Sequence, residues 1–210
     1  MAGMGLTYWV SIVLAILMLD GCVSLTKSNP EKHYYALDAG LQVETYTSLH
    51  GAVLKIRKFR AAPAFEGKEL VYRTSDSRYE DDFYNVWLVR PNAMLTQQVL
   101  EWLSAAGLFE YVMDSSGPLP ATHTLEGRVT ALYGDYRSTP AKAVLGLQFF
   151  LIRETSSEPE IFLQREYRKE VELSDTSPDA LVNGWNAALR LILSDLDEDL
   201  NRSLQSQVRR

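Results

Sequence analysis

Three long β-rich segments follow one another in the second half of the chain, and they limit the folds that it can adopt. Residues 123–133 and 161–173 alternate apolar with polar side chains, which predicts two strands with one solvent-exposed face each. Residues 143–152 are apolar almost throughout and predict a central strand covered on both faces. Two short polar segments join the three strands, at 134–141 and 154–160. The sequence therefore predicts an antiparallel meander within one sheet.

Two further segments have the apolar spacing of amphipathic helices. The first begins at Pro91, which suits an early helical position, and ends at Gly107, which suits a left-handed cap. The second begins after Thr176 or Ser177 as its cap. Its apolar stripe is predicted to pack on the sheet and contains Leu181, Trp185, Ala188, Leu189, Ile192, Leu196 and Leu200. Its acidic side chains are expected to face water: Asp195, Asp197, Glu198 and Asp199.

Shorter β-rich segments precede and separate these helices. They predict strands at 33–37, 52–59, 68–73, 82–87 and 108–113, with a loop at 60–67. Strand and helix do not alternate strictly along the chain. The predicted fold is therefore α/β, a single domain with a mixed, largely antiparallel sheet of about five to seven strands and two main helices.

The N-terminal segment has the pattern of a bacterial export signal. Its apolar stretch, Leu6–Leu19, has about fourteen residues, which is short for a membrane span and typical of the hydrophobic region of a signal peptide. The stretch ends in "LDGC", formed by Leu19, Asp20, Gly21 and Cys22. This ending resembles the bacterial lipobox, in which the cysteine is acylated and becomes the first residue of the mature protein, although Asp20 replaces the usual small residue. An ordinary cleaved signal and an uncleaved anchor are the alternatives.

Cys22 is the only cysteine of the chain, so the mature protein depends on its core rather than on intrachain disulfides for stability. Val23 and Ser24 follow it. In Gram-negative lipoproteins an aspartate directly after the cysteine is the inner-membrane retention signal, so the lipobox resemblance implies the outer membrane. The predicted organisation is a signal peptide at 1–21, a lipidated cysteine and tether at 22–32, a domain at 33–204 and a frayed tail at 205–210.

The sequence contains no recognisable catalytic or metal-binding constellation. Its histidines have no second ligand at metal-site spacing: His33, His50 and His123. The acidic run Glu80–Asp82 is expected to be a solvated charge run rather than a metal site or a carboxylate pair. A Gly-x-Ser-x-Gly elbow and a glycine-rich phosphate loop are both missing from the sequence. We therefore expect a binding or scaffolding role, with no enzyme activity, no cofactor and no metal.

The net charge argues against nucleic acid as a partner. The chain has a formal charge of −6, and removing residues 1–21, whose one charged residue is Asp20, leaves −5. A broad nucleic-acid footprint needs a basic surface, which a mildly acidic domain of this kind is not expected to have.

Four stretches, in their order along the chain, resemble the ABC-transport auxiliary lipoproteins, the PqiC-like family: "LDGC", "YYAL", "VLKIRKFRAAPAFEGKELVYR" and "YNVWLVRPNAMLTQQVLEWL". The resemblance implies a three-layer α/β domain related in fold to the N-terminal domain of TolB. It also implies partners, namely an MCE-domain protein that spans the periplasm and its ABC permease and ATPase, which move lipids or other hydrophobic compounds. The lipoprotein is then the outer-membrane component, lipid-anchored and facing the periplasm, and some family members form homo-oligomeric rings.

The resemblance includes a Tyr-x-x-Trp motif, here Tyr84 and Trp87. Together with Tyr34 and Tyr35, these residues are candidate anchors of a partner interface, since tyrosine and tryptophan are common in interface hot spots. The alternative for each residue is packing between helix and sheet. Two other functions stay open. A gene without MCE or ABC neighbours would favour an independent envelope scaffold, and a buried carboxylate pair in a pocket would favour a periplasmic enzyme.

Replacing Cys22 by Ala should abolish acylation of the protein and block its cleavage by the lipoprotein signal peptidase, because the cysteine thiol receives the lipid. Incorporation of labelled palmitate in growing cells measures acylation, and mass spectrometry of the mature N-terminus locates the cleavage. An unmodified mature N-terminus at any other residue would contradict this prediction.

Overall fold

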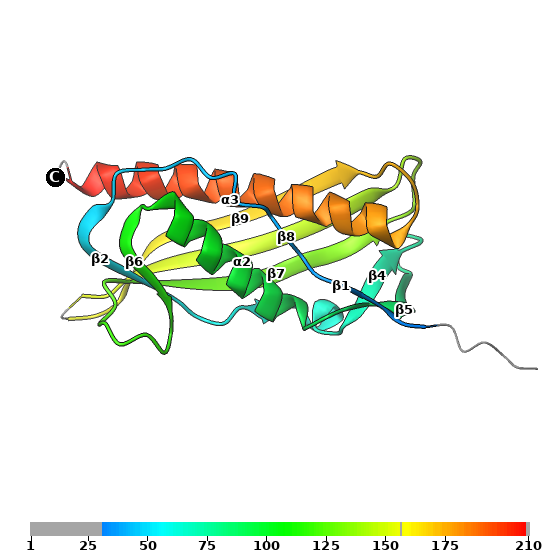
Figure 1. Cartoon of the computed structure of the whole chain (residues 1–210), viewed down its shortest axis with the longest axis horizontal. Helices are drawn as coiled ribbons and strands as arrows, with labels where there is room; N and C mark the ends of the chain where they lie inside the picture. The colour runs from blue at the N-terminus through cyan, green and yellow to red at the C-terminus, as the bar shows by residue number, and fades with distance from the viewer. Residues whose placement is uncertain (1–30, 156, 209–210) are drawn as a thin grey trace, which may run out of the picture. The chain divides into compact units, whose positions relative to one another are not determined.

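Strand β7 (His123–Asp135) pairs with four other strands, more than any other strand of the described sheet. The structure, a computed structural model, describes residues 31–155 and 157–208 (Figure 1). Along one edge β7 pairs antiparallel over its whole length with β8 (Lys142–Arg153). Strand β8 in turn pairs antiparallel with β9 (Glu160–Glu172). The predicted meander is therefore confirmed.

The other edge of β7 pairs in parallel with three short strands, one after another: β2 (Leu49–Ile56), β3 (Arg60–Ala61) and β4 (Glu69–Arg73). Further strands extend the sheet: β6 (Phe109–Asp114) beside β2, β5 (Tyr79–Trp87) beside β4, and β1 (His33–Tyr35) beside β5. The mixed sheet therefore has nine strands among the described residues. The predicted loop at 60–67 contains β3 and the 3-10 helix η1 (Pro63–Phe65), which are too short to leave a pattern in the sequence.

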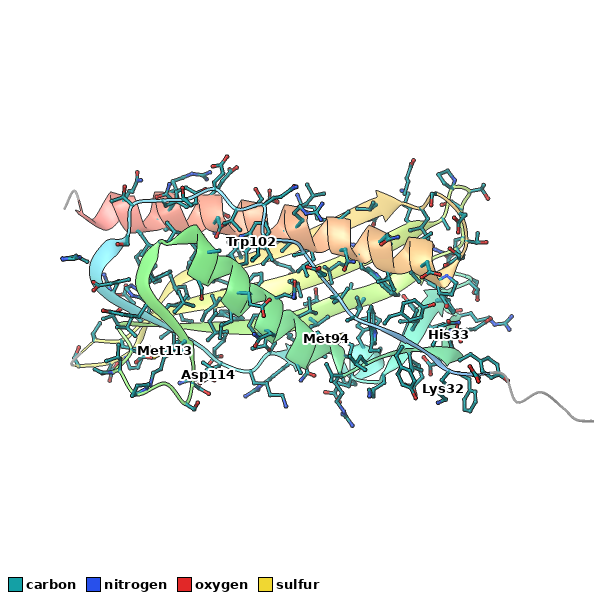
Figure 2. The ribbon with its side chains drawn as sticks, viewed as in Figure 1. Lys32, His33, Met94, Trp102, Met113 and Asp114 are labelled. Carbon is teal, nitrogen blue, oxygen red and sulfur yellow. The ribbon has the colours of Figure 1, made fainter. Side chains whose placement is uncertain are left out.

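The two predicted helices are α2 (Pro91–Ala106) and α3 (Pro178–Val208). The buried side of α2 includes Met94 and Trp102 (Figure 2), and Gly107 ends the helix with a φ of 70°, in the left-handed region that glycine adopts at low cost. The N-terminus of α3 is capped by Ser177, whose Oγ accepts a hydrogen bond of 3.1 Å from the backbone N–H of Ala180. Helix α3 continues through residues 205–208, the first part of the segment predicted as a frayed tail.

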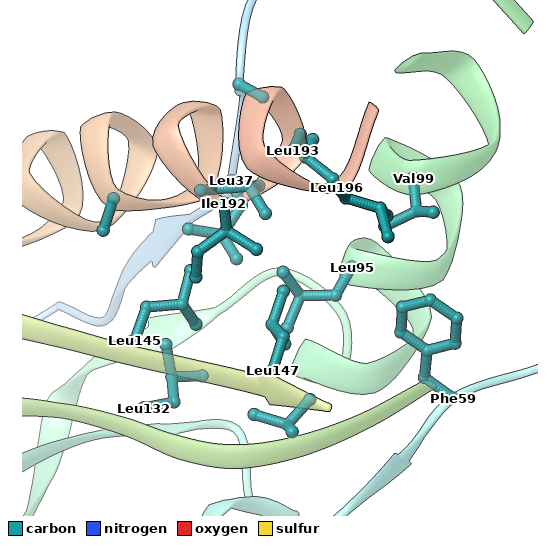
Figure 3. Packing of buried hydrophobic residues seen from close by; sticks show 14 of the residues in the cluster. Leu37, Phe59, Leu95, Val99, Leu132, Leu145, Leu147, Ile192, Leu193 and Leu196 are labelled. Atoms are coloured by element: carbon teal, nitrogen blue, oxygen red, sulfur yellow. The ribbon is translucent and has the colours of Figure 1, made fainter. Parts of the chain in front are cut away.

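Both helices lie over the same face of the sheet (Figure 1). Alternate residues of β8 point at them and are completely buried: Ala143, Leu145, Leu147, Phe149 and Leu151. Figure 3 shows Leu145 and Leu147 facing Leu95 of α2 and Ile192 of α3. On the opposite face, Gln148, Phe150 and Ile152 are only half-buried. The α/β class, the mixed sheet and the two main helices are confirmed, and the helices form a single layer. The prediction that β8 is covered on both faces holds at Val144 and Gly146 but not at the half-buried positions that follow on the same face.

An extended segment, residues 36–48, crosses the outside of the helices (Figure 1). Leu37 and Ala39 of this segment are buried. The N–H of Ala39 donates to Gln98 Oε1 of α2 at 2.8 Å, and the C=O of Ala39 accepts from Arg190 Nε of α3 at 2.7 Å. The segment therefore ties the two helices together from outside and forms the layer farthest from the sheet.

Trp185 is the largest side chain at the contact between α3 and the sheet. It is 0% exposed, its ring lies 5.1 Å from that of Trp87, and its Nε1–H donates to the C=O of Val144 at 3.1 Å. Every other residue of the predicted stripe of α3 is also 0% exposed: Leu181, Ala188, Leu189, Ile192, Leu196 and Leu200. The prediction that this helix packs on the sheet is confirmed.

Asp197 corrects the prediction that the acidic residues of α3 face water. It is 2% exposed, and its Oδ2 accepts a hydrogen bond of 2.5 Å from Trp102 Nε1 of α2. Its position follows from helical spacing, since it lies four residues after Leu193 and three before Leu200 on the buried stripe. Burial raises the pKa of Asp197 to about 7, against the lowering effect of the Trp102 hydrogen bond.

Replacing Trp185 by Ala should lower the free energy of unfolding by about 3–5 kcal/mol, because it leaves a cavity under α3 and removes the hydrogen bond to the Val144 carbonyl. Leu191→Ala on the same helix is the control, since Leu191 is 49% exposed and its loss should cost less than about 0.5 kcal/mol. Urea unfolding followed by circular dichroism measures both. Equal small losses would show that α3 is not held by its buried stripe.

The free energy of unfolding should fall as pH rises from about 4 to 7 through Asp197, because the unfolded chain ionises there while the folded protein keeps the proton. At about 1.4 kcal/mol per pKa unit, the contribution is on the order of 2–4 kcal/mol. Asp197→Asn should therefore match wild type near pH 4 and exceed it near pH 8. Glu198→Gln, an exposed neighbour, should leave the pH profile unchanged. Parallel profiles for Asp197→Asn and wild type would disprove a raised pKa.

Candidate functional site

A groove of about 660 Å³ is lined by residues of β3, β7 and β8, by the segment that precedes β3, and by Asn92 at the start of α2. Four cationic side chains line it, namely Arg57, Lys58, Arg60 and Arg128, against two acidic ones, Glu66 and Glu126. The register of β3 and β7 places Arg60 directly opposite Arg128, and that of β7 and β8 places Gln148 beside Arg128. Half-buried Phe150 and exposed Pro63 add apolar surface to the walls.

Only one of the four groove cations forms an ion pair among the described residues. Arg57 forms an ion pair with Glu126. Within the part of the chain that the structure describes, Lys58, Arg60 and Arg128 form no ion pair, although all three are exposed. Like charges directly opposite each other in a sheet are destabilising, so an anionic group placed between Arg60 and Arg128 would be attracted. The groove therefore fits an acidic partner surface.

The sequence analysis did not identify this groove. Lys58 and Arg60 belong to one segment, whereas Arg128 lies 68 residues further along the chain than Arg60. Only the parallel pairing of β3 with β7 brings the three side chains together, and a strand of two residues gives no signal in the sequence.

The four aromatic residues that were candidate interface anchors lie at the β1–β5 end of the sheet. Trp87 is not on the surface: it is 1% exposed and packs on Trp185, as expected of the alternative in which it packs between helix and sheet. Tyr35 is half-buried, and its hydroxyl donates to Asn85 Oδ1 at 3.1 Å. Tyr34 and Tyr84 are exposed. The structure therefore leaves two of the four side chains on the surface.

Asp82 builds the turn that exposes Tyr84. Strand β4 pairs Leu70 with Asp82 and Glu69 with Val86, so residues 83–85 bulge out of the ladder. Asp82 Oδ1 accepts hydrogen bonds from the N–H groups of Tyr84 and Asn85 at 2.9 and 3.0 Å. Its Oδ2 accepts from the Tyr72 hydroxyl and from Asn85 Nδ2 at 2.6 and 2.7 Å.

These four hydrogen bonds determine the charge state of Asp82. Burial raises its pKa, but the bonds favour the carboxylate and outweigh burial, so its pKa lies below the ordinary value. Asp82 is therefore a half-buried structural carboxylate, whereas Glu80 and Asp81 are exposed as expected of a solvated charge run.

The ionisable side chains of the described residues that were considered as metal or catalytic candidates lie apart from one another. Among residues 31–155 and 157–208, no group of three or more His, Cys, Asp or Glu side chains is arranged to hold a metal ion. The expected histidines lie apart: His33 is exposed, His50 is 3.5 Å from Glu110, and half-buried His123 has its pKa lowered by burial. Asp197 bonds to Trp102 and lines none of the larger grooves. It is thus a single structural acid, and not the carboxylate pair in a pocket that would favour an enzyme.

The predicted lipidation site and its lipobox, Leu19, Asp20, Gly21 and Cys22, lie outside the described residues. Among the helices that the structure does describe, none combines the length and the apolar character that a membrane crossing requires.

Comparisons with known proteins identify relatives of this domain. A family model described as "ABC-type transport auxiliary lipoprotein component" matches residues 35–196. The solved structure of a Xanthomonas campestris protein of family DUF330 superposes with a TM-score of 0.68 at 16% identity, covering 85% of this chain and 100% of that one. An uncharacterised protein of known structure gives a TM-score of 0.60 at 19% identity, covering 83% and 99%. These two likenesses establish a shared fold.

A weaker structural likeness is to the PelC dodecamer of Paraburkholderia phytofirmans, with a TM-score of 0.41 at 15% identity, covering 79% of this chain and 93% of that one. At that score it has no bearing on the assembly of this chain. No curated protein matches the sequence significantly.

Proposed function

The chain belongs to the family of ABC-type transport auxiliary lipoprotein components, and we propose that it is the non-catalytic, outer-membrane lipoprotein of an MCE-type ABC transport system. The observation that carries this proposal is the family match over residues 35–196, which spans most of the described domain. The lipobox-like Leu19–Cys22 supports a lipid anchor, and the absence of aspartate at the two positions after Cys22 supports the outer membrane.

In this proposal each component has a separate task. The acyl chains at Cys22 hold the domain at the membrane, because each buried methylene contributes about 0.8 kcal/mol of membrane affinity. The chain has no glycine-rich phosphate loop, so the ABC ATPase supplies the energy of transport. An MCE-domain protein that spans the periplasm carries lipids or other hydrophobic compounds. This lipoprotein binds the outer-membrane end of that MCE-domain protein.

The groove lined by Lys58, Arg60 and Arg128 is the proposed docking surface for that partner. Its unpaired cations favour an acidic segment, and complementary charge speeds association and selects the partner. Anchoring both proteins in one envelope raises their effective concentration, so a modest intrinsic affinity suffices. Several copies arranged as a ring around the partner would multiply this contact.

Photo-crosslinking in native envelopes tests the partnership. A photoreactive residue at Lys58 should give an adduct with the MCE-domain protein as its principal product. Replacing both Arg60 and Arg128 by Glu should lower the adduct yield at least about tenfold, the equivalent of about 1.4 kcal/mol of lost affinity. Arg202→Glu, an exposed change on α3, is the matched control and should leave the yield unchanged.

Deletion of the gene should sensitise cells to the same compounds as deletion of the permease gene. An abundant protein without an MCE adduct, or one that fractionates with the inner membrane alone, would favour an independent envelope scaffold. An MCE adduct that is insensitive to Arg60 and Arg128 would retain the partnership and reject the groove as its site.

A further inference from the structure

We infer that the β1–β5 end of the domain rests on the membrane surface that holds the anchor, and that exposed apolar side chains there seat the domain in one orientation. The inference rests on the proposed lipid anchor at Cys22 but not on the transport partnership. The side chains concerned are called the tether-end patch and are Tyr34, Phe83, Tyr84, Leu88 and Val89, with exposed fractions of 61, 66, 41, 56 and 47%.

The members of the tether-end patch lie close together because β1 and β5 pair. Tyr34 is the register partner of Val86, and the N–H of Leu88 donates to the C=O of Tyr35 at 2.7 Å. The rings of Phe83 and Tyr84 are 5.2 Å apart. Exposed apolar groups scattered singly are ordinary, but a contiguous group of this kind marks a contact surface.

The fold holds this patch in its exposed position. The four hydrogen bonds accepted by Asp82 fix the bulge at residues 83–85, which carries Phe83 and Tyr84 outward. The ammonium group of Lys32 lies 4.3 Å from the centre of the Phe83 ring. Exposure of Phe83 is therefore a property of a braced turn, and not of a loosely held loop.

The length and end point of the tether identify what covers the patch. Nine residues, 23–31, lie between Cys22 and Lys32, and these ten steps along the chain span at most about 35 Å when fully extended. The tether ends at Lys32, which contacts Phe83 and directly precedes β1 (Figure 2). The tether therefore enters the described domain at the patch, which places these exposed apolar side chains within reach of the membrane that holds the anchor.

The chemistry of the patch suits a phospholipid surface. Aromatic rings, tyrosine included, favour the level of the lipid headgroups, where an apolar body and a polar tip are both accommodated. Lys32 and Arg90 are exposed beside the apolar side chains and can approach phosphate groups, whereas Glu80 and Asp81 are exposed further back along β5. Since the acyl chains already provide the affinity, the contribution of the patch is orientation.

The test uses the mature chain, residues 22–210, coupled through the Cys22 thiol to a maleimide lipid in vesicles of phosphatidylethanolamine and phosphatidylglycerol. Chemical coupling makes the result independent of lipoprotein processing and of any transport partner. Phe83→Trp places a fluorophore in the patch, and Leu191→Trp places one at an exposed site on α3 as the matched control. The signal of the buried tryptophans is subtracted with the unsubstituted chain.

With brominated lipids in the vesicles, fluorescence from Phe83→Trp should be quenched at least about twofold more than that from Leu191→Trp. Adding Tyr34→Ser and Leu88→Ser to Phe83→Trp should remove the difference, with circular dichroism confirming the fold. Equal quenching at the two sites would overturn the inference. If Phe83→Trp is not quenched, and if the chain forms dimers that Leu88→Ser abolishes, the inference is overturned and the patch binds a second copy of the chain. Failure of the MCE crosslink with quenching intact would reject only the transport proposal.

Discussion

The antiparallel ladder between β7 and β8 is the constraint on which the rest of the molecule depends. It aligns 12 pairs of residues, and the other edge of β7 pairs with β2, β3 and β4, three strands that do not pair with one another. A slip of one residue in this ladder would turn the core face of β8 toward water. It would also separate Arg128 from Gln148, so the groove and the core depend on the same register.

One glycine shows how closely the ladder is fitted to its surroundings. A Cβ atom at Gly127 would lie 2.5 Å from the ring of Phe59, which packs edge-on against Phe149 at 5.7 Å. Phe59 directly precedes Arg60, so the aromatic ring that fills the core also fixes the segment that carries two of the groove cations. Packing on one side of the sheet thus positions charge on the other.

The parts of the fold that could be predicted from the sequence are those with local signals. The meander follows from alternation, and the helix limits follow from Pro91, Gly107 and Ser177. The parallel pairing along β7 could not be predicted, because it joins short segments that are distant in sequence. Asp197 was assigned to water because of its charge, although its helical spacing places it on the buried stripe beside Trp102. The groove was missed because it depends on the parallel pairing of β3 with β7. The burial of Trp87 shows that aromatic content alone does not separate core residues from interface residues.

The extended segment over the helices gives the domain a mechanical property. In the proposed anchored state, tension from Cys22 would enter the described domain at Lys32, and a pull along β1 would load its three register pairs with β5 together. Such a load shears all of these contacts at once, whereas a perpendicular pull would open them one by one. Beyond β1, the load passes to Leu37 and Ala39 and is shared by both helices through Gln98 and Arg190. The N-terminal end of the domain is therefore held by the sheet and by both helices, so a load applied there would be shared between the two layers.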